Sequence, residues 1–542
     1  MTDEAPPPSR VIASPIDDRV AARRGVTILL LLAGAGLMVN YVETMMVPAL
    51  PALVRFFGGV PYPTVAWVVS AYLLVGVVTT PLFAKLGDIY GKKRVMVALL
   101  AVYALAVSVA GYTPALAATV GLARSQAIYL LIAVRGVQGM GLALFPLAFA
   151  MIGEELPPER VGPAQGLVAA TFAVGATVGL FVGSWLIQSQ GWAFAYHTAI
   201  PAAVALVALA AWQLPESRHR LAVGVDLSGA ALLGGALATF LLALTEGPSW
   251  GWTNPTAVAL GPLVGGVPEL LVLAAGLAAL FYWRERTASF PMLPLERLRE
   301  RNLALSYMAI LLVGVALFLG FVGLTVYVET PVVGLGDSVF EFGLLSLPTT
   351  VSMLVAAPFV GRAIGRFGPK PVLLGGAVLS TAGFLTILGF HRTYLEVAVT
   401  AVPTFVGLVA MIIAITNIVV LSARRGETGI QTGLSEMFQD LGASIGPVLV
   451  AAVLASLTTA VPVGRTVPGG GVPASIGLPT PGSFDWIFAI GALLSVVVGL
   501  LGVFLRRRTG PETGPVVDPS PGTAGATPVR PAGNGAMPGP AE

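Results

Sequence analysis

The stretch AKLGDIYGKKR at residues 84–94 is the turn on which the predicted fold depends, and GRAIGRFGPKP at residues 361–371 repeats its pattern. Each copy follows an apolar run long enough to cross a membrane, and each places a glycine seven residues into the motif, with basic charge close by. Glycine suits a tight turn between two helices because it tolerates positive φ. The repetition predicts two related helical bundles in one chain.

A second pair of similar segments supports the same conclusion. GATVGLFVGS at residues 175–184 resembles GASIGPVLVA at residues 442–451, at a spacing close to that of the first pair. A weaker repeat is the tetrapeptide Tyr-Val-Glu-Thr, which occurs at residues 41–44 and again at residues 327–330. Membrane transporters are often built from such repeats, with the substrate site between the two halves near the middle of the bilayer.

The composition is that of a polytopic membrane protein. Of the 542 residues, 56% are hydrophobic and 11% are charged, with a mean hydropathy of +0.86. A soluble domain usually carries about 25% charged residues. Because a spanning helix needs about 20 apolar residues, the sequence predicts about fourteen of them. We expect them at 27–54, 64–86, 94–113, 127–152, 161–188, 192–214, 226–246, 263–283, 303–328, 338–364, 371–390, 396–423, 428–457 and 484–505.

The basic residues test this count, because they collect in alternate loops. The loops on the opposite side hold only four arginines: Arg55, Arg124, Arg392 and Arg465. Positive charge marks the cytoplasmic side of a membrane protein. We therefore expect a multi-pass protein of the plasma (inner) membrane with both termini cytoplasmic.

The predicted organisation is an all-α membrane protein of two pseudo-symmetric six-helix bundles with two inserted transmembrane helices. We expect five parts: a cytoplasmic N-terminal segment at 1–25, an N-terminal six-helix bundle at 26–222, two inserted helices at 223–290, a C-terminal six-helix bundle at 291–508, and a disordered cytoplasmic tail at 509–542.

Several kinds of chemistry are excluded or unsupported by the residues present. The chain has no cysteine, which excludes disulfides and thiolate metal sites. GDIYGKK is not a phosphate-binding loop, because it has three residues between its glycines and a lysine in place of Ser or Thr. The basic residues lie in short loops, so we expect no nucleic acid partner. We predict no metal, no cofactor and no enzymatic activity.

Glu43 is the first candidate for a functional residue, because it lies inside the first predicted apolar run. An ionised acid at mid-bilayer costs about 2.5–3.5 kcal/mol, so it should face a cavity or a partner. Arg135 in the fourth predicted helix lies at a similar depth and is the candidate partner. Asn40 is on the same helical face as Glu43, and Pro48 should loosen the helix one turn beyond it. The alternatives are a structural ion pair or a glutamate that stays protonated.

At these residues the chain resembles the major facilitator superfamily, in particular its fourteen-helix drug:proton antiporter branch. The loop signature of that family is matched by Leu86, Asp88, Gly91, Lys92, Lys93 and Arg94, with Ala84 in place of the first glycine. Its fourth-helix signature is matched by Arg135, Gln138, Gly139 and Gly141. Its fifth-helix signature is matched in part by Gly175, Gly179 and Gly183, with Leu180 and Ser184 at positions where the family has Pro and Gly.

The resemblance implies roles for these residues. Asp88, Gly91, Lys92 and Arg94 would form a conformational latch between the halves, although the basic residues would also be expected from topology alone. Gly175, Gly179 and Gly183 would form either ordinary helix packing or a hinge. Asn40 and Gln138 are expected to line the substrate cavity.

Glu436 and Asp440 are one helical turn apart inside the thirteenth predicted helix. They are either a further proton site or cation site, or two acids solvated by a crevice. If both acids and Glu43 face the cavity, its net charge is negative and favours cations and protons.

The resulting hypothesis is a proton-coupled secondary carrier that exports hydrophobic or cationic small molecules by alternating access. The alternatives are a lipid exporter and a proton-coupled nutrient symporter of the same fold. The expected partners are a small-molecule or lipid substrate, protons and membrane lipids, and we expect the protein to be a monomer.

Overall fold

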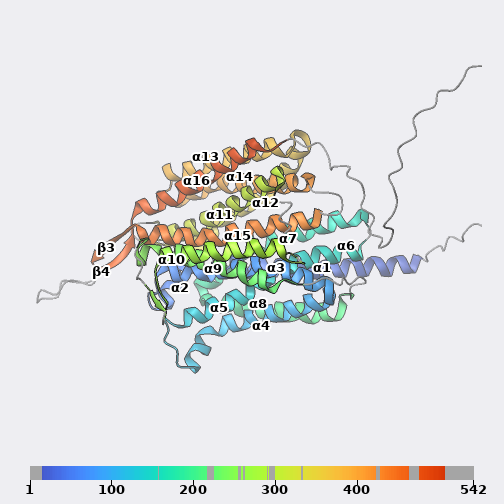
Figure 1. Ribbon diagram of the computed structural model, residues 1–542, viewed down its shortest axis with the longest axis horizontal. Helices are drawn as coiled ribbons and strands as arrows, with labels where there is room; N and C mark the ends of the chain where they lie inside the picture. The colour runs from blue at the N-terminus through green and yellow to red at the C-terminus, as the bar shows by residue number, and fades with distance from the viewer. Residues whose placement is uncertain are drawn as a thin grey trace, which may run out of the picture.

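A computed structural model shows the chain as a bundle of long helices that run roughly along one common direction (Figure 1). It describes residues 15–156, 158–216, 225–253, 258–260, 263–289, 291, 299–330, 334–422, 428–462 and 475–506. The start of the predicted N-terminal segment and the whole predicted tail at 509–542 lie outside these residues.

The first six passes across the bundle form the N-terminal half. Its elements are α1 (Pro15–Thr44), α2 (Leu50–Phe56), α3 (Tyr62–Tyr90), α4 (Lys92–Thr119), α5 (Ala127–Gly139), the 3₁₀ turn η1 (Met140–Ala143), α6 (Leu144–Glu155), α7 (Pro158–Gln190) and α8 (Trp192–Gln213). The segments α5, η1 and α6 together make one pass. Two further passes follow, with a short antiparallel strand pair between them: α9 (Leu227–Trp250), β1 (Val258–Leu260), β2 (Leu263–Gly265) and α10 (Val267–Thr287).

The last six passes form the C-terminal half. Its elements are α11 (Arg301–Glu329), α12 (Val339–Phe367), α13 (Pro369–Gly389), α14 (Tyr394–Ser422), α15 (Thr428–Ser456), the antiparallel pair β3 (Thr458–Pro462) and β4 (Ser475–Pro479), and α16 (Pro481–Phe504). Within the described residues, thirteen helices are long and apolar enough to cross a membrane. The helix α7, with 33 residues, is the fourteenth long pass.

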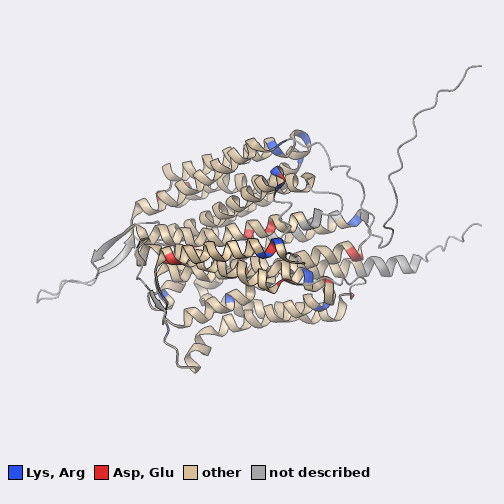
Figure 2. Cartoon of the chain, viewed as in Figure 1, with Lys and Arg blue, Asp and Glu red and all other residues tan. Residues whose placement is uncertain are grey.

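An even number of passes leaves the start of α1 and the end of α16 at the same end of the bundle, which we call the terminal face. The opposite end carries the strand pairs and is called the strand face (Figure 1). Lys and Arg lie mostly at the terminal face, while acidic positions also occur well inside the bundle (Figure 2). The described part of the chain thus shows the charge asymmetry that the sequence predicts.

The predicted first helix at 27–54 is wrong in detail, because it is two helices. The chain leaves helical geometry after Thr44 and forms a tighter turn, in which the amide of Val47 donates to the carbonyl of Thr44 and that of Ala49 donates to Met46. Pro48 has no N–H to continue the ladder, and Pro51 occupies the first turn of α2, where proline is tolerated. The helix also begins earlier than predicted, at Pro15.

Two other boundaries differ from the prediction. Residues 263–265 pair as β2, so the predicted helix at 263–283 begins only at Val267, after Gly265 and Gly266. The predicted fourth helix at 127–152 contains the tighter turn η1 at Met140–Ala143. The passes themselves are where the sequence places them, because their length and hydropathy are strong signals.

The glycine stripe of α7 packs directly against the backbone of α1. A methyl group added at Gly175 would lie 2.5 Å from the carbonyl oxygen of Leu37, and one added at Gly179 would lie 2.1 Å from the Thr44 hydroxyl. One at Gly183 would lie 2.6 Å from Met45 Cβ. Small residues let helices approach closely where apolar side chains gain nothing from leaving lipid.

The same contact recurs in the C-terminal half, where α15 crosses α11. An added methyl at Gly442 would lie 1.9 Å from the carbonyl oxygen of Leu311, and one at Gly446 would lie 2.8 Å from the amide nitrogen of Leu319. The repeated sequences at 175–184 and 442–451 therefore make equivalent contacts in the two halves. Both copies of Tyr-Val-Glu-Thr likewise come at the end of the first long helix of a half, α1 and α11.

The two halves meet along two pairs of helices, α3 with α15 and α7 with α12. Near the strand face, Gly343 of α12 lies so close to Ser184 of α7 that an added methyl would be 2.5 Å from Ser184 Cβ. The rings of Phe181 and Phe340 also meet there, 6.1 Å apart. The inserted helix α9 packs against both α3 and α15, so it covers one of the two seams between the halves.

Asp226 holds the two inserted helices together at the terminal face. Its carboxylate accepts from the Ser228 hydroxyl, from the Gly229 amide at 3.0 Å, and from Nε of Arg284 at 3.1 Å. Burial opposes ionisation of this group, but the hydrogen bonds from Ser228 and Gly229 and the charge of Arg284 outweigh it and lower the pKa of Asp226 to about 2. The carboxylate therefore caps α9 and ties it to α10 at neutral pH.

Replacing Gly179 by alanine should destabilise the protein by about 1–3 kcal/mol, because the new methyl overlaps Thr44 and the backbone of α1. Thermal unfolding of the purified protein in detergent measures the effect. The matched control is Gly276→Ala in α10, where the added methyl meets nothing within 4 Å. Equal unfolding temperatures for the two variants would contradict the close crossing.

Asp226→Asn should lower stability by about 1–2 kcal/mol at neutral pH, because the amide keeps the shape of the cap and loses the charge that holds Arg284. Because the pKa of Asp226 is lower in the folded than in the unfolded protein, the ionised carboxylate stabilises the fold at pH values above the ordinary carboxyl pKa. This stabilisation is lost as the pH falls toward about 2. Thermal unfolding at neutral pH checks this, and an unchanged melting temperature would contradict it.

Candidate functional site

A cavity of about 320 Å³ lies between the two halves, on the terminal-face side of the contact between Ser184 and Gly343. Its walls come from α1, α3, η1, α6 and α7 of the N-terminal half and from α11, α12 and α15 of the C-terminal half. Their side chains are Asn40, Glu43, Thr44, Val47, Thr80, Leu142, Phe145, Pro146, Phe149, Ala176, Thr177, Leu180, Leu317, Phe318, Phe321, Thr350, Met353, Glu436, Met437, Gln439 and Asp440. Both halves of the internal repeat therefore contribute to one site.

Three carboxyl groups line this cavity: Glu43 from α1, and Glu436 and Asp440 from α15. They come from opposite halves of the protein, and the negative charges of Glu43 and Glu436 both act on Asp440. Like charges this close destabilise one another, so the cavity favours either bound protons or a bound cation. The three acids predicted from the sequence are thus brought to one cavity.

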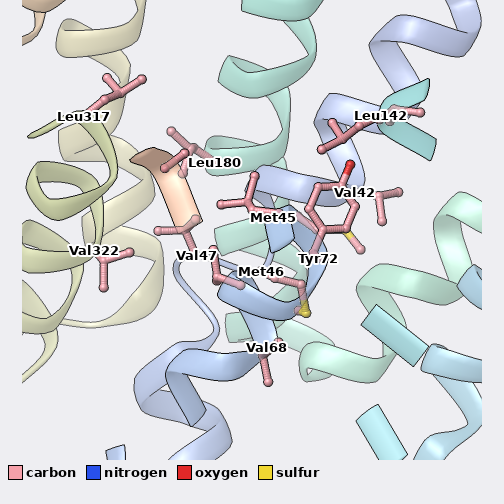
Figure 3. Close-up of a cluster of buried hydrophobic side chains, with 14 of the residues drawn as sticks. Val42, Met45, Met46, Val47, Val68, Tyr72, Leu142, Leu180, Leu317 and Val322 are labelled. Carbon is pink, nitrogen blue, oxygen red and sulfur yellow. The ribbon is translucent and has the colours of Figure 1, made fainter. Parts of the chain in front are cut away.

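The break after α1 explains the position of Glu43. The helix ends at Thr44, whose hydroxyl is bonded to the carbonyl of Asn40 at 2.8 Å and to that of Ala176 on α7 at 3.2 Å. The following turn directs Met45 and Met46 into the apolar packing beside Tyr72 (Figure 3), while Val47 lines the cavity. Glu43 is thereby held at the edge of this packing, with its side chain on the cavity wall.

Arg135 does not form the direct ion pair with Glu43 that the sequence suggests. Among the described residues its hydrogen-bond partners are the carbonyls of Val68 at 2.9 Å and Val42 at 3.5 Å and the side chain of Gln138 at 2.9 Å. The guanidinium lies over the ring of Tyr72, 4.4 Å from its centre. The positive charge of Arg135 still attracts the carboxyl group of Glu43. A fully buried arginine is held best by several fixed acceptors, because its donors form a rigid fork.

Gln138 is also placed differently from the prediction. It is fully buried, donates from Nε2 to the carbonyl of Ala106 on α4 at 3.2 Å, and accepts from Arg135. It is not among the cavity-lining residues, because this pair of bonds turns it toward α4. Asn40, in contrast, lines the cavity, and its buried amide nitrogen has no hydrogen-bond partner. Such a donor is available to a polar group of a bound molecule.

The rest of the cavity wall is mainly apolar. Aromatic side chains come from α6 and α11, namely Phe145, Phe149, Phe318 and Phe321, with Met353 and Met437 beside them. Aromatic rings attract cations through their faces, and methionine adapts to ligands of different shape. The sequence analysis did not single out these residues, since aromatic residues in apolar helices carry no distinguishing signal before the helices are packed.

The turn between α3 and α4 has the form that its sequence predicts. Gly91 has φ of 101°, which suits glycine, and it is the single residue between the two helices. The buried Lys92 pairs with Asp88 at 3.2 Å and with Glu154 of α6, and Arg94 pairs with Glu216 at 3.2 Å. These partners belong to the N-terminal half. The predicted latch between the two halves stays a prediction.

Comparison with known proteins identifies the family. The chain matches the Major Facilitator Superfamily over residues 32–447 and, in a second alignment, residues 310–534. The protein belongs to the Major Facilitator Superfamily. Members of this superfamily are membrane transporters rather than enzymes, so this protein is a transporter and not an enzyme.

Relatives are named for multidrug resistance, multidrug transport, or resistance to and export of one drug. The chain is 28% identical over 435 residues to the multidrug resistance protein Stp of Mycobacterium tuberculosis, which covers 80% of this chain and 76% of Stp. It is 27% identical over 398 residues to the tetracenomycin C resistance and export protein of Streptomyces glaucescens, covering 72% and 69% of the two chains. It is 24% identical over 418 residues to the multidrug transporter MdtP of Bacillus subtilis, covering 76% and 72%.

Solved structures agree on the fold. The human organic anion transporter MFSD10 superimposes with a TM-score of 0.56 at 16% identity, covering 88% of this chain and 99% of that one. A structure of a D-xylose-proton symporter superimposes with a TM-score of 0.59 at 12% identity, covering 89% and 97%. At such low identity these structures establish the transporter fold alone.

Within the described residues, no group of three or more His, Asp or Glu side chains could hold a metal ion.

Arg135→Lys should destabilise the protein by about 1–3 kcal/mol although the charge is kept, because an ammonium group cannot reach both the Val68 carbonyl and Gln138. Thermal unfolding in detergent measures the effect. The matched control is Arg124→Lys, since Arg124 is exposed and lies over the ring of Phe56 at 5.2 Å; a change within about 0.5 kcal/mol is expected there. If both variants lose the same stability, the buried network around Arg135 is not what holds this region.

Proposed function

We propose that this protein is a proton-coupled exporter of hydrophobic or cationic small molecules. The observation that carries the proposal is the cavity between the halves, where three carboxyl groups face an otherwise apolar and aromatic wall. A lipophilic cation can bury its apolar part against the phenylalanines and place its charge beside the carboxylates. The names of the relatives Stp and MdtP, both multidrug proteins, favour the same substrate class.

Coupling follows from competition between protons and substrate for the same acids. When the carboxyl groups of Glu43, Glu436 and Asp440 are protonated, the cavity is neutral and a cation is released. When the protons leave, the negative cavity binds a cation again. If the protein alternates between opening to either side, proton entry is exchanged for substrate exit. Each net charge that enters, beyond the charge that the substrate carries out, gains about 2.3 kcal/mol from a potential of about 100 mV, enough for roughly fifty-fold export.

The orientation of the protein is part of this proposal. The basic residues of the terminal face, which Figure 2 shows, favour a cytoplasmic location for that face and for both ends of the chain, in a plasma (inner) membrane. The cavity lies on the terminal-face side of the contacts that join α7 to α12, so it would be filled from the cytoplasm in the state described. We also expect a monomer, since one chain supplies both halves of the cavity.

Two other functions are consistent with the fold. A proton-coupled nutrient symporter would use the same acids and the opposite substrate direction. A lipid exporter would use the inserted helices α9 and α10, of which α9 covers the seam between α3 and α15. The relatives named for drug export favour the multidrug proposal over both.

The test uses protein reconstituted into liposomes with an imposed pH gradient and a fluorescent lipophilic cation. We expect dye accumulation in liposomes whose interior is acidic. Glu43→Gln, Glu436→Gln and Asp440→Asn should each reduce gradient-driven dye accumulation at least about tenfold, because each removes a proton-binding group from the cavity.

The matched control is Glu246→Gln, a half-buried glutamate on the inserted helix α9 that does not line the cavity. It should transport at nearly the wild-type rate. Dye accumulation driven by the opposite gradient would indicate symport, and movement of a fluorescent lipid without dye transport would indicate a lipid exporter. If Glu43→Gln transports as well as wild type under the gradient, proton coupling through this residue is wrong.

A further inference from the structure

Glu329 is a buried acid that the transport cavity does not use. It is the last residue of α11, eight residues beyond the cavity-lining Phe321, which places it about 12 Å further toward the strand face. Its side chain is 4% exposed, and both of its carboxylate oxygens are buried without a hydrogen-bond partner. Glu43, its counterpart in the other copy of Tyr-Val-Glu-Thr, lines the cavity instead.

The surroundings of Glu329 come from both halves of the protein. From the N-terminal half, Tyr62 at the start of α3 and Arg55 on α2 interact with it electrostatically. The Tyr62 hydroxyl is itself buried without a partner, while Arg55 is exposed and forms no ion pair with Glu329. The helices α2 and α11 are in contact here, although they belong to different halves. Glu329 thus lies where the halves close over the strand-face side of the cavity.

The chain around Glu329 completes its enclosure. The segment after α11 folds back on the helix end, where the amide of Leu335 donates to the carbonyl of Tyr327 at 3.1 Å and that of Asp337 donates to Val328 at 2.9 Å. Within the described part of α15, no titratable residue follows Asp440 toward the strand face.

Several acids and one histidine also lie near this end of α11. Asp337 and Glu341 interact with each other, and burial raises the pKa of Asp337. Around the neighbouring Tyr327 lie Glu396 of α14 and Asp485 of α16, together with His391, which is 4.0 Å from Asp485. Arg124 and Arg392 lie in other loops at this end, and Arg55 is the basic group that acts on Glu329.

We propose that Glu329 is a proton-binding gate residue, which holds a proton while the strand face is closed and releases it to water when that face opens. Burying an ionised carboxylate without a partner is strongly unfavourable, so the closed state keeps the neutral carboxylic acid. Opening hydrates the group, the O–H bond breaks, the proton passes to water, and the carboxylate is left facing Arg55. Because the open state binds fewer protons, raising the pH on the strand-face side favours opening.

This inference uses the opening and closing of the strand face, which is part of the proposed function, but it does not require protons to be exchanged for substrate. Lowering the pH on that side would close the strand face. The external proton concentration would thus control how readily the empty carrier closes to the outside and returns to the state that binds substrate. Glu43, Glu436 and Asp440 would still carry the coupling itself.

The test uses the absence of native cysteine. Ser184→Cys introduces a single thiol at the fully buried contact between α7 and α12, where it becomes reactive only when the strand face opens. Labelling by a membrane-impermeant maleimide is measured against a reference, Ala123→Cys in the exposed turn between α4 and α5, which corrects for the effect of pH on the thiol. The ratio of the two labelling rates should rise about fivefold or more from about pH 5.5 to about pH 8.

Glu329→Gln, which keeps the neutral shape of the protonated side chain, should abolish this rise and leave the ratio low. His391→Gln is the control for the histidine at this end of the molecule, and it should retain the rise. Arg55→Gln removes an exposed charge and should shift the midpoint to higher pH by up to about one pH unit. This variant also decides the question if Glu329→Gln does not fold.

Three results would overturn the proposal: a rise that persists in Glu329→Gln, a rise that disappears in His391→Gln, or a Ser184→Cys thiol that is unreactive at every pH. If Glu329→Gln does not fold, an unshifted midpoint in Arg55→Gln overturns it. The dye experiment separates this inference from the proposed function, because a pH-dependent gate can exist in a carrier whose transport ignores the pH gradient.

Discussion

The crossing of α1 over the glycine stripe of α7 is the contact on which the arrangement of the cavity depends. Gly175, Gly179 and Gly183 let the two backbones touch, and the Thr44 hydroxyl bridges them by bonding to Ala176. This contact fixes the end of α1 at the point where the chain turns toward Pro48. Glu43, Thr44 and Val47 therefore line the cavity, while Met45 and Met46 fill the apolar core. A larger residue in the stripe would move the acid as well as the helix.

The same arrangement is repeated in the C-terminal half with a different outcome. Gly442 and Gly446 press α15 against α11 as Gly175 and Gly179 press α7 against α1. The acids, however, are distributed unequally. In the first half the cavity acid is Glu43, near the end of α1, and in the second half the cavity acids are Glu436 and Asp440 of α15. The repeat thus supplies a symmetric scaffold, and unequal substitution on it gives an asymmetric binding cavity.

Charge inside this protein is handled in three ways. Arg135 is fully buried and is held by carbonyl oxygens, Gln138 and the Tyr72 ring. Asp226 is paired at the edge of the inserted helices. The cavity acids remain beside an open volume, where ligand or water can reach them. A carboxyl group that has neither a partner nor access to the cavity, as at Glu329, must hold its proton in the closed state.

The number of passes, their approximate limits and the family follow from the amino-acid sequence, because apolar runs, loop charges and the glycine motifs are local signals. Glu43, Glu436 and Asp440 can also be identified in it, since acids are rare in apolar helices. Their partners depend on how the helices pack. Two residues at similar depth, Glu43 and Arg135, can face in different directions, and Gln138 can turn toward α4 instead of the cavity. The break at residues 45–49, the apolar lining and the isolation of Glu329 also depend on contacts between distant helices, and no local pattern in the chain encodes those contacts.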